Sequence, residues 1–245
     1  MNLLEVQGLR KTYPAFRLED VSFSVPEGAV MGLIGRNGAG KSTTLKSILG
    51  LVHPDAGRVE MFGREFSENE RYIKENIGVV LGGIDFYPKK KVRTITDVTR
   101  RFYSNWQEEK YRHYLDLFAI DENKRVDQLS SGMRVKYLLA LALSHNARLL
   151  ILDEPTSGLD PVSRDELTEL LRSIAADGTR SVLFSTHITS DLEKCASHIT
   201  FIQEGRLQRS DTLAGFMAHY ADLGSTLEEI IVAAERRPYD ADAII

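Results

Sequence analysis

Residues 30–50 constrain the fold more than any other stretch of the chain, because they place a strand, a glycine loop and a helix in succession. The apolar run Val30 to Ile34 predicts a short buried strand, and the residues after Lys41 carry apolar side chains at helical spacing. Between them the sequence GRNGAGKST fits the pattern G-x-x-x-x-G-K-[ST]. This combination predicts a site for the phosphates of a nucleoside triphosphate. An ordinary glycine-rich turn is the alternative, and the flanking strand and helix disfavour it.

The residue types in this loop suit a triphosphate, which needs many hydrogen-bond donors in a small space. Glycines let the backbone amides point inward, and the helix that follows adds the positive end of its dipole. We expect Lys41 to reach the β- and γ-phosphates and the Ser42 hydroxyl to hold Mg²⁺. The residues predicted to contact the nucleotide are Gly35, Asn37, Gly38, Ala39, Gly40, Lys41, Ser42 and Thr43.

Composition limits the classes of protein that remain. A chain of 245 residues has room for one large domain or for one domain with an inserted subdomain. The net charge of −4 provides no bulk attraction to nucleic acid. The single cysteine, Cys195, excludes an intrachain disulfide and a zinc site built on cysteine pairs, and we expect it to be an inert core residue. No signal-peptide pattern and no apolar run of about 20 residues is present, which predicts a soluble chain.

The pattern along the chain predicts a parallel sheet with helices and an inserted helical segment. Strands are expected at 3–9, 21–25, 58–62, 77–81, 148–152, 181–185 and 198–204, with a loop at 9–17. Helices are expected at 66–76 and 161–176, and the residues after 204 are expected to be mostly helical with a frayed polar tail. Helical periodicity at 94–104, 107–118 and 131–145 predicts a helical subdomain whose core contains Tyr103, Trp106, Tyr111, Tyr114 and Phe118.

Two acidic residues follow the predicted strand at 148–152. We expect Asp153 to support the magnesium shell and Glu154 to polarise a water toward the γ-phosphate, because ligands bind at the carboxyl edge of a parallel sheet. His187 ends the next strand, where it can bond the γ-phosphate and orient that water. The alternatives are acidic residues in solvent and a histidine that caps a surface helix. The phosphate loop upstream favours the site roles.

With these residues in place, the chain resembles the nucleotide-binding domain of an ATP-binding cassette (ABC) transporter. Residues 129–133, LSSGM, resemble the family's LSGGQ signature, and LLILDEP matches its Walker B motif. Residues 157–160, SGLD, match the D-loop, and His187 matches the switch histidine. Tyr13 stands where the family stacks an aromatic side chain on adenine. The resemblance covers roughly residues 3–210.

The resemblance implies an α/β fold: a P-loop NTPase core with a mostly parallel sheet, an antiparallel β front layer and an inserted α-helical subdomain. It implies that segments 1–83 and 147–215 form the ATP-binding core with its β subdomain. Residues 84–146 would form the helical signature subdomain, and 216–245 a helical C-terminal extension and tail.

The implied function is ATP binding and hydrolysis, with Mg²⁺, in a head-to-tail dimer that drives transport through a separate polytopic membrane permease. Each ATP would lie between the phosphate loop of one subunit and Ser130, Ser131 and Gly132 of the other. Asp160 of the D-loop would also belong to the nucleotide-binding residues. The pair would be a homodimer or a heterodimer at the cytoplasmic face of the membrane, without nucleic acid. Catalysis would rest on Glu154 and His187, and the metal on Ser42 and Asp153.

Three departures from the family pattern stand out. Gly82 occupies the position of the Q-loop glutamine, which removes one usual contact to Mg²⁺. Ser131 and Met133 replace glycine and glutamine of the signature, and the helical insert is compact. Together these features resemble bacterial exporter ATPases linked to peptide-antibiotic resistance. The basic run Lys89–Lys91 is interpreted as a solvated turn, with contact to a permease helix or to lipid headgroups as the alternative.

The main alternative function is a soluble ABC ATPase of DNA repair, chromosome maintenance or translation. Only 85 residues separate Thr43 from Leu129, which leaves no space for a long coiled coil, and only one cassette is present. A cassette that binds ATP without hydrolysing it is suggested by Gly82 alone, and the presence of Glu154 and His187 argues against it.

Overall fold

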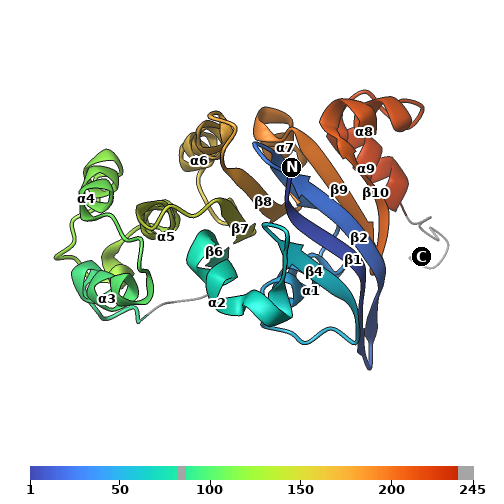
Figure 1. The fold of residues 1–245 in the computed structure, drawn as a ribbon. Coiled ribbons are helices and arrows are strands. Elements are labelled where there is room, and N and C mark those ends of the chain that lie inside the picture. Colours follow the sequence, from blue (N-terminus) through green and yellow to red (C-terminus); the bar gives the residue numbers. More distant parts are fainter. Residues whose placement is uncertain (82–86, 237–245) are drawn as a thin grey trace.

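A computed structural model describes residues 1–81 and 87–236. In this part of the chain the strands form one curled sheet of ten, in the order β5-β4-β1-β2-β10-β9-β3-β8-β7-β6 (Figure 1). The position of Gly82 and the predicted frayed tail from 237 onward lie outside the described residues. The strands are β1 (Asn2–Tyr13), β2 (Phe16–Pro26), β3 (Val30–Ile34), β4 (Ala56–Met61), β5 (Arg64–Glu65), β6 (Ile77–Leu81), β7 (Leu149–Asp153), β8 (Ser181–Thr186), β9 (His198–Gln203) and β10 (Arg206–Thr212).

The centre of the sheet is parallel, because β9, β3, β8, β7 and β6 pair in parallel with their neighbours. β3 is buried at every position, as a strand covered on both faces requires. β1, β2, β4 and β5 pair antiparallel and form the front layer. The expected combination of a parallel core and an antiparallel front layer is confirmed. The helices are α1 (Lys41–Ile48), α2 (Phe66–Asn76), α3 (Val92–Thr99), α4 (Glu108–Leu117), α5 (Ser131–Ser144), α6 (Pro161–Ala175), α7 (Thr189–Cys195), α8 (Leu213–His219) and α9 (Leu227–Glu235).

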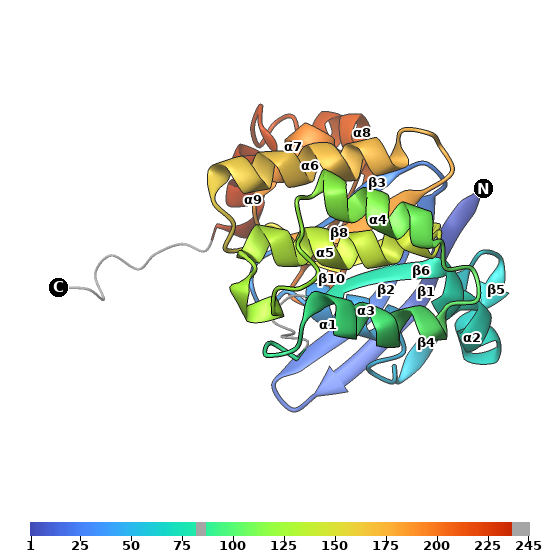
Figure 2. The same cartoon turned by 90° about the vertical axis from the view of Figure 1, so that its left-hand side faces the viewer.

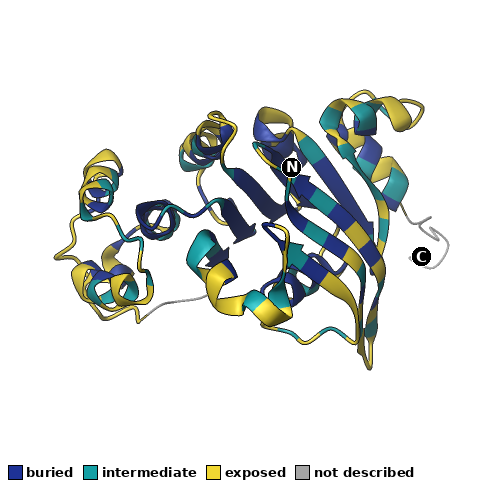
Figure 3. Cartoon of the chain, in the orientation of Figure 1, coloured by how far each residue is buried: buried dark blue, intermediate teal, exposed yellow. Residues whose placement is uncertain are grey.

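Two apolar cores lie on opposite faces of the parallel strands. One core joins Met31 and Leu33 of β3 to α1 and to the front layer. The other joins Val30 and Ile34 of the same strand to helices α5, α6, α7, α8 and α9. Successive side chains of a strand point to opposite faces, so β3 supplies both cores and its end is held firmly where the phosphate loop begins. The buried strands run through the middle of the molecule in Figure 3.

Helices α3, α4 and α5 enclose a third core, and Figure 2 shows α3, α4 and α5 on one side of the molecule. Of the predicted aromatic residues, Tyr111 and Phe118 are buried in this core, and Trp106 and Tyr114 pack against it. Tyr103 is different, because its ring stacks on His145 with centroids 3.7 Å apart. The buried hydroxyls of this segment are paired, with Thr96 Oγ1 2.7 Å from Tyr111 Oη and 2.9 Å from Tyr137 Oη.

The expected loop at 9–17 is wrong. β1 continues to Tyr13 and β2 begins at Phe16, so Pro14 and Ala15 alone form the turn of a hairpin. The sequence pattern does not reveal the outer end of β1, because its residues are largely exposed and mostly polar. Asp55 holds it there: its carboxylate accepts hydrogen bonds from Lys11 Nζ at 2.9 Å and from the Thr12 amide at 2.7 Å.

The expectation that the residues after 204 are mostly helical omits one strand, because Arg206–Thr212 is strand β10. It pairs antiparallel with β9 across the turn at Glu204 and Gly205, whose φ angles are +49° and +77°. Positive φ at both central residues is the geometry of the tight hairpin turns that suit twisted strands. The helices begin after it, at Leu213. No helix in residues 1–81 or 87–236 has the length and apolar character to span a membrane.

Candidate functional site

The phosphate loop runs from the end of β3 into α1, and its glycines are required by their surroundings. Gly35 has φ of +156°, and a Cβ there would lie 2.1 Å from the carbonyl oxygen of Ile202. Gly40 has φ of +113°, and a Cβ there would lie 2.9 Å from the Phe16 ring. No side chain fits at either position without displacing β9 or β2. The loop is therefore packed directly on the sheet.

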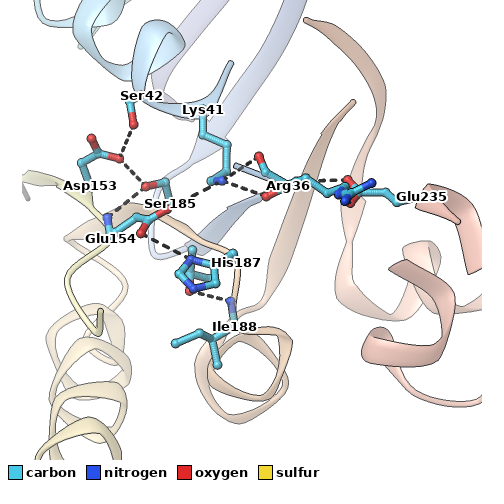
Figure 4. Close-up of polar contacts among 11 residues, drawn as sticks. Arg36, Lys41, Ser42, Asp153, Glu154, Ser185, His187, Ile188 and Glu235 are labelled. Atoms are coloured by element: carbon cyan, nitrogen blue, oxygen red, sulfur yellow. Dashed lines mark hydrogen bonds and ion pairs between the residues drawn. The ribbon is translucent and has the colours of Figure 1, made fainter. Parts of the chain in front are cut away.

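Lys41 lies buried beneath this loop, at 4% exposure. Its ammonium donates hydrogen bonds to the carbonyl oxygens of Gly35 at 2.7 Å and Arg36 at 3.2 Å, and it lies 3.7 Å from the Glu154 carboxylate (Figure 4). Burial lowers the pKa of Lys41, while the negative charges of Glu154, Asp153 and Glu235 act in the opposite direction. The cation is thus fixed at the loop by backbone acceptors and nearby carboxylates.

Ser42 and Asp153 meet beside Lys41. The Ser42 hydroxyl donates a hydrogen bond to Asp153 Oδ1 at 3.1 Å, and Ser185 Oγ donates to the same oxygen at 2.6 Å. Asp153 ends β7 and Ser185 lies on the neighbouring strand β8, with which it is in register. A hydroxyl and a carboxylate side by side form the hard oxygen set that Mg²⁺ prefers, with its remaining positions left for phosphate and water. The chemistry of these donors fits the metal.

Glu154 follows with an unusual backbone, at φ of +48°. Its amide donates to both the carbonyl oxygen and the hydroxyl of Ser185, at 3.1 and 3.0 Å, and these bonds hold the strained residue in place. The carboxylate spans two partners, because Oε1 lies 3.7 Å from Lys41 Nζ and Oε2 lies 3.3 Å from His187 Nδ1. The structure therefore brings Glu154 and His187 together with Lys41, as the sequence predicts.

The signature residues form a second cluster. Ser130 caps α5, since its hydroxyl accepts a hydrogen bond from the Met133 amide at 3.2 Å. Ser131 Oγ donates to the Gly158 carbonyl at 3.4 Å, and a Cβ on Gly132 would lie 3.2 Å from Ser163 Oγ. The signature thus packs on the segment that leads into α6.

Asp160 completes this cluster as the cap of α6. Its side chain accepts hydrogen bonds from the amides of Val162 and Ser163, each at 3.1 Å. Proline at the first helical position follows it, as the sequence predicts. The side chains of this cluster form hydrogen bonds with residues of α5, of α6 and of the segment before α6. Lys41 takes part in none of these hydrogen bonds.

Tyr13 ends β1, where it is 38% exposed and lies with its ring 5.8 Å from Lys11 Nζ. Its pairing partner in the hairpin is Phe16, and it is Phe16 that packs against Gly40 of the loop. Asn37 and Gly38 are exposed at the outer turn of the loop. Of the remaining loop residues, Ala39 is buried, and Thr43 is half-buried in α1.

Three contributors to the site were missed from the sequence: Phe16, Ser185 and Glu235. Phe16 lies in the segment that was expected to be a loop, so no strand pattern pointed to it. Ser185 directly precedes Thr186 and His187, and its strand pairing with Asp153 is the signal that could have found it. Glu235 accepts a hydrogen bond from the Arg36 amide at 3.1 Å across 199 residues, and no local pattern announces such a contact.

Two features outside the site are the basic run and the single cysteine. Lys89–Lys91 are exposed, which fits a solvated turn and a contact with a permease helix or lipid headgroups equally well, so the interpretation stays a prediction. Cys195 is the last residue of α7 and is buried, and burial raises the pKa of its thiol to about 12. A thiol of that kind is unreactive at neutral pH.

Comparison with known proteins agrees with this geometry. Residues 18–157 match the family described as ABC transporter. The bacitracin transport ATP-binding protein BcrA of Bacillus licheniformis is 33% identical over 208 residues, which cover 84% of this chain and 68% of that protein. The Nod factor export ATP-binding protein I of Burkholderia orbicola is 39% identical over 191 residues, covering 76% of this chain and 62% of the relative.

Solved structures give the same result. A structure described as the ATP-binding subunit of an ABC transporter superposes with a TM-score of 0.85 at 28% identity, covering 96% of this chain and 100% of the other. A dimeric ATP-binding cassette in a post-hydrolysis state with ADP and Pi shares the fold, with a TM-score of 0.75 at 21% identity over 86% of this chain and 98% of its own. The chain belongs to the ABC transporter family, as an ATP-binding subunit with ATPase activity.

Proposed function

We propose that this chain binds MgATP at the phosphate loop and hydrolyses it with Glu154 and His187, and so drives a separate membrane permease. The observation that carries the proposal is the convergence of Lys41, Glu154 and His187 beside the paired Ser42 and Asp153. Of the remaining residues, Gly35, Asn37, Gly38, Ala39, Gly40 and Thr43 are proposed to bind the phosphates and Tyr13 the adenine. Segments 1–83 and 147–215 would form the ATP-binding core.

In this proposal Ser42 and Asp153 would hold Mg²⁺, and the ion would supply positive charge to the triphosphate. The Lys41 ammonium donates hydrogen bonds to the β- and γ-phosphates. Glu154 accepts a hydrogen bond from a water molecule, and the His187 imidazole orients that water and the γ-phosphate. The water oxygen bonds to the γ-phosphorus as the bond to the bridging oxygen breaks, and Glu154 takes the water proton. The two hydrogen bonds from the Glu154 amide to Ser185 support this role, because they hold the strained backbone that carries the carboxylate.

The second cluster supports a head-to-tail dimer. Ser130, Ser131 and Gly132 begin the 14-residue helix α5, whose N-terminal dipole favours an anion. The hydroxyls of Ser130 and Ser131 form hydrogen bonds with Met133 and Gly158, and not with the phosphate loop of the same chain. We propose that the three residues contact a γ-phosphate held by a second subunit. We propose that ATP closes the dimer between the two surfaces, with Asp160 at the interface, and that hydrolysis lets it reopen.

The name of one relative, the Nod factor export ATP-binding protein I, supports export as the direction of transport, and the relative BcrA is named for bacitracin transport without a direction. The chain spans 62% and 68% of these two relatives' lengths, so their substrates are not transferred to it. We propose that the protein is peripheral, at the cytoplasmic face of the membrane. There it would form a homodimer or a heterodimer with another ATPase subunit.

The substitution Glu154→Gln tests the hydrolysis site. Glutamine keeps the shape of the side chain but does not take a proton, so we expect turnover to fall by a factor on the order of 10² or more. ATP binding is expected to persist, and ATP is expected to trap a dimer that size-exclusion chromatography with light scattering detects. Glu109→Gln, on the exposed surface of α4, is the control and should match the original protein. Undiminished turnover of Glu154→Gln would place the base elsewhere.

A further inference from the structure

The Gly35–Arg36 peptide is held from both sides. Its carbonyl oxygen accepts the hydrogen bond from Lys41 Nζ at 2.7 Å, and its N–H, which belongs to Arg36, donates to Glu235 Oε1 at 3.1 Å (Figure 4). The peptide bond is planar and trans, so its C=O and N–H point in opposite directions. Fixing the N–H on Glu235 therefore directs the carbonyl at Lys41.

Helix α9 is docked so that it delivers Glu235 to this peptide. Leu227 and Ile230 are fully buried in the core beneath α9. The Leu227 amide donates to Glu193 of α7 at 2.6 Å, and Gln203 at the end of β9 donates to the Ala234 carbonyl at 3.1 Å. The second of these bonds lies one residue before Glu235. The carboxylate is thus placed by contacts at both ends of its helix.

A carboxylate at the position of Glu235 is electrostatically unfavourable. Formation of the helix alone therefore does not account for the contact between Glu235 and the Arg36 amide. The last residue of a helix faces the negative end of the dipole, where an acidic side chain is disfavoured. The side chain is only 7% exposed, and burial raises the pKa of Glu235. What offsets the cost is the Arg36 amide, together with the Arg36 guanidinium, whose Nε lies 3.7 Å from Oε2.

We propose that Glu235 is a positioning residue of the phosphate site, which acts on Lys41 through the Gly35–Arg36 peptide. The inference rests on the proposed role of Lys41 in binding ATP. Glu235 orients the carbonyl that accepts the hydrogen bond from the Lys41 ammonium. The docking of α9 thereby sets the affinity of the loop for ATP.

Calorimetric titration of the full chain with ATP tests this role. Glu235→Ala removes the acceptor, and we expect the Kd for ATP to rise on the order of tenfold, as for loss of a charge-assisted hydrogen bond. Glu235→Gln keeps an acceptor oxygen and should stay within about threefold of the original protein. Glu228→Ala, exposed on the same helix, is the control and should leave the Kd unchanged. The Tm of all three variants should stay close to that of the original, because Leu227 and Ile230 still dock α9.

Two results would overturn the inference: an unchanged Kd in Glu235→Ala, or a glutamine variant as impaired as the alanine variant. Lys41→Ala separates this failure from failure of the proposed function. If the original protein binds ATP and Lys41→Ala loses binding while Glu235→Ala does not, only the role of Glu235 is refuted. If Lys41→Ala binds ATP as well as the original protein, the proposed phosphate site itself is wrong.

Discussion

At the scale of single residues, the chemistry of the site follows from motif and position, whereas the contacts that hold it do not. The spacing of Gly35, Gly40 and Lys41 predicts a phosphate loop because few backbones permit that curl. Glu154 was predicted from its place after a buried strand. Its positive φ and the two hydrogen bonds from its amide to Ser185 become visible only when β7 and β8 are paired. The residues of a motif are close together in the sequence, whereas the residues that hold them in place, such as Ser185, are distant in the sequence.

His145 gives a residue-scale prediction about pH. It is 1% exposed, stacks on Tyr103, and its Nδ1 has no hydrogen-bond partner among the described residues. Burial lowers its pKa from 6.5 to about 4, so the unfolded chain binds the proton more readily. The stability due to neutral His145 is complete above pH 6.5 and is lost as pH falls toward 4. We expect this loss to reach about 3 kcal/mol at pH 4.

The test compares urea unfolding of the original protein and His145→Phe from pH 7.5 to pH 4. Phenylalanine keeps a ring against Tyr103 but does not titrate. The carboxyl groups titrate in both proteins, so the difference between the two stability curves isolates His145. The variant should lose about 3 kcal/mol less than the original over this range. Parallel curves would show that His145 is not held neutral by burial.

At the scale of elements, the buried strands and the long helices were predictable and the exposed strands were not. β3, β7 and β8 are apolar runs covered on both faces, which makes them obvious in the sequence. β10 contains only exposed and half-buried residues, so its sequence carries little apolar signal. The outer end of β1 is missed for the same reason. Pairing with neighbouring strands, rather than side-chain pattern, defines both.

Gly205 tests the turn that creates β10. It has φ of +77°, and a Cβ there would lie 1.8 Å from the carbonyl oxygen of Arg17 on β2. Gly178 is a matched control, with φ of +74° and no atom of the described residues within 4 Å of the position that a Cβ would take. Gly178→Ala should cost about 1 kcal/mol, the left-handed backbone penalty alone. Gly205→Ala should cost about 3 kcal/mol or more, since β2 must also shift.

Urea unfolding of both variants at one temperature measures the difference. Because the two glycines share a backbone conformation, the excess cost of Gly205→Ala reports the contact between the β9–β10 turn and β2. Equal losses in the two variants would mean that this close approach does not exist in solution.

At the scale of the whole molecule, the sheet places two groups of functional residues on one chain. The phosphate loop, Asp153 and Glu154 lie at the carboxyl ends of parallel strands, where ligands bind in such sheets. The signature and Asp160 form the other group, at the starts of α5 and α6. The family resemblance predicted these two groups from the order of the motifs. It did not predict that α9 packs against the phosphate loop.

The proposed function requires that this ATPase chain works on a separate membrane subunit. The direct measurement is affinity purification of the tagged chain from detergent-solubilised membranes of its own cells, with the co-purified proteins identified by mass spectrometry. We expect a polytopic membrane protein in stoichiometric amount. Recovery from the soluble fraction alone, with DNA-bound or ribosomal partners, would contradict the proposal and would assign the chain to the soluble ABC ATPases.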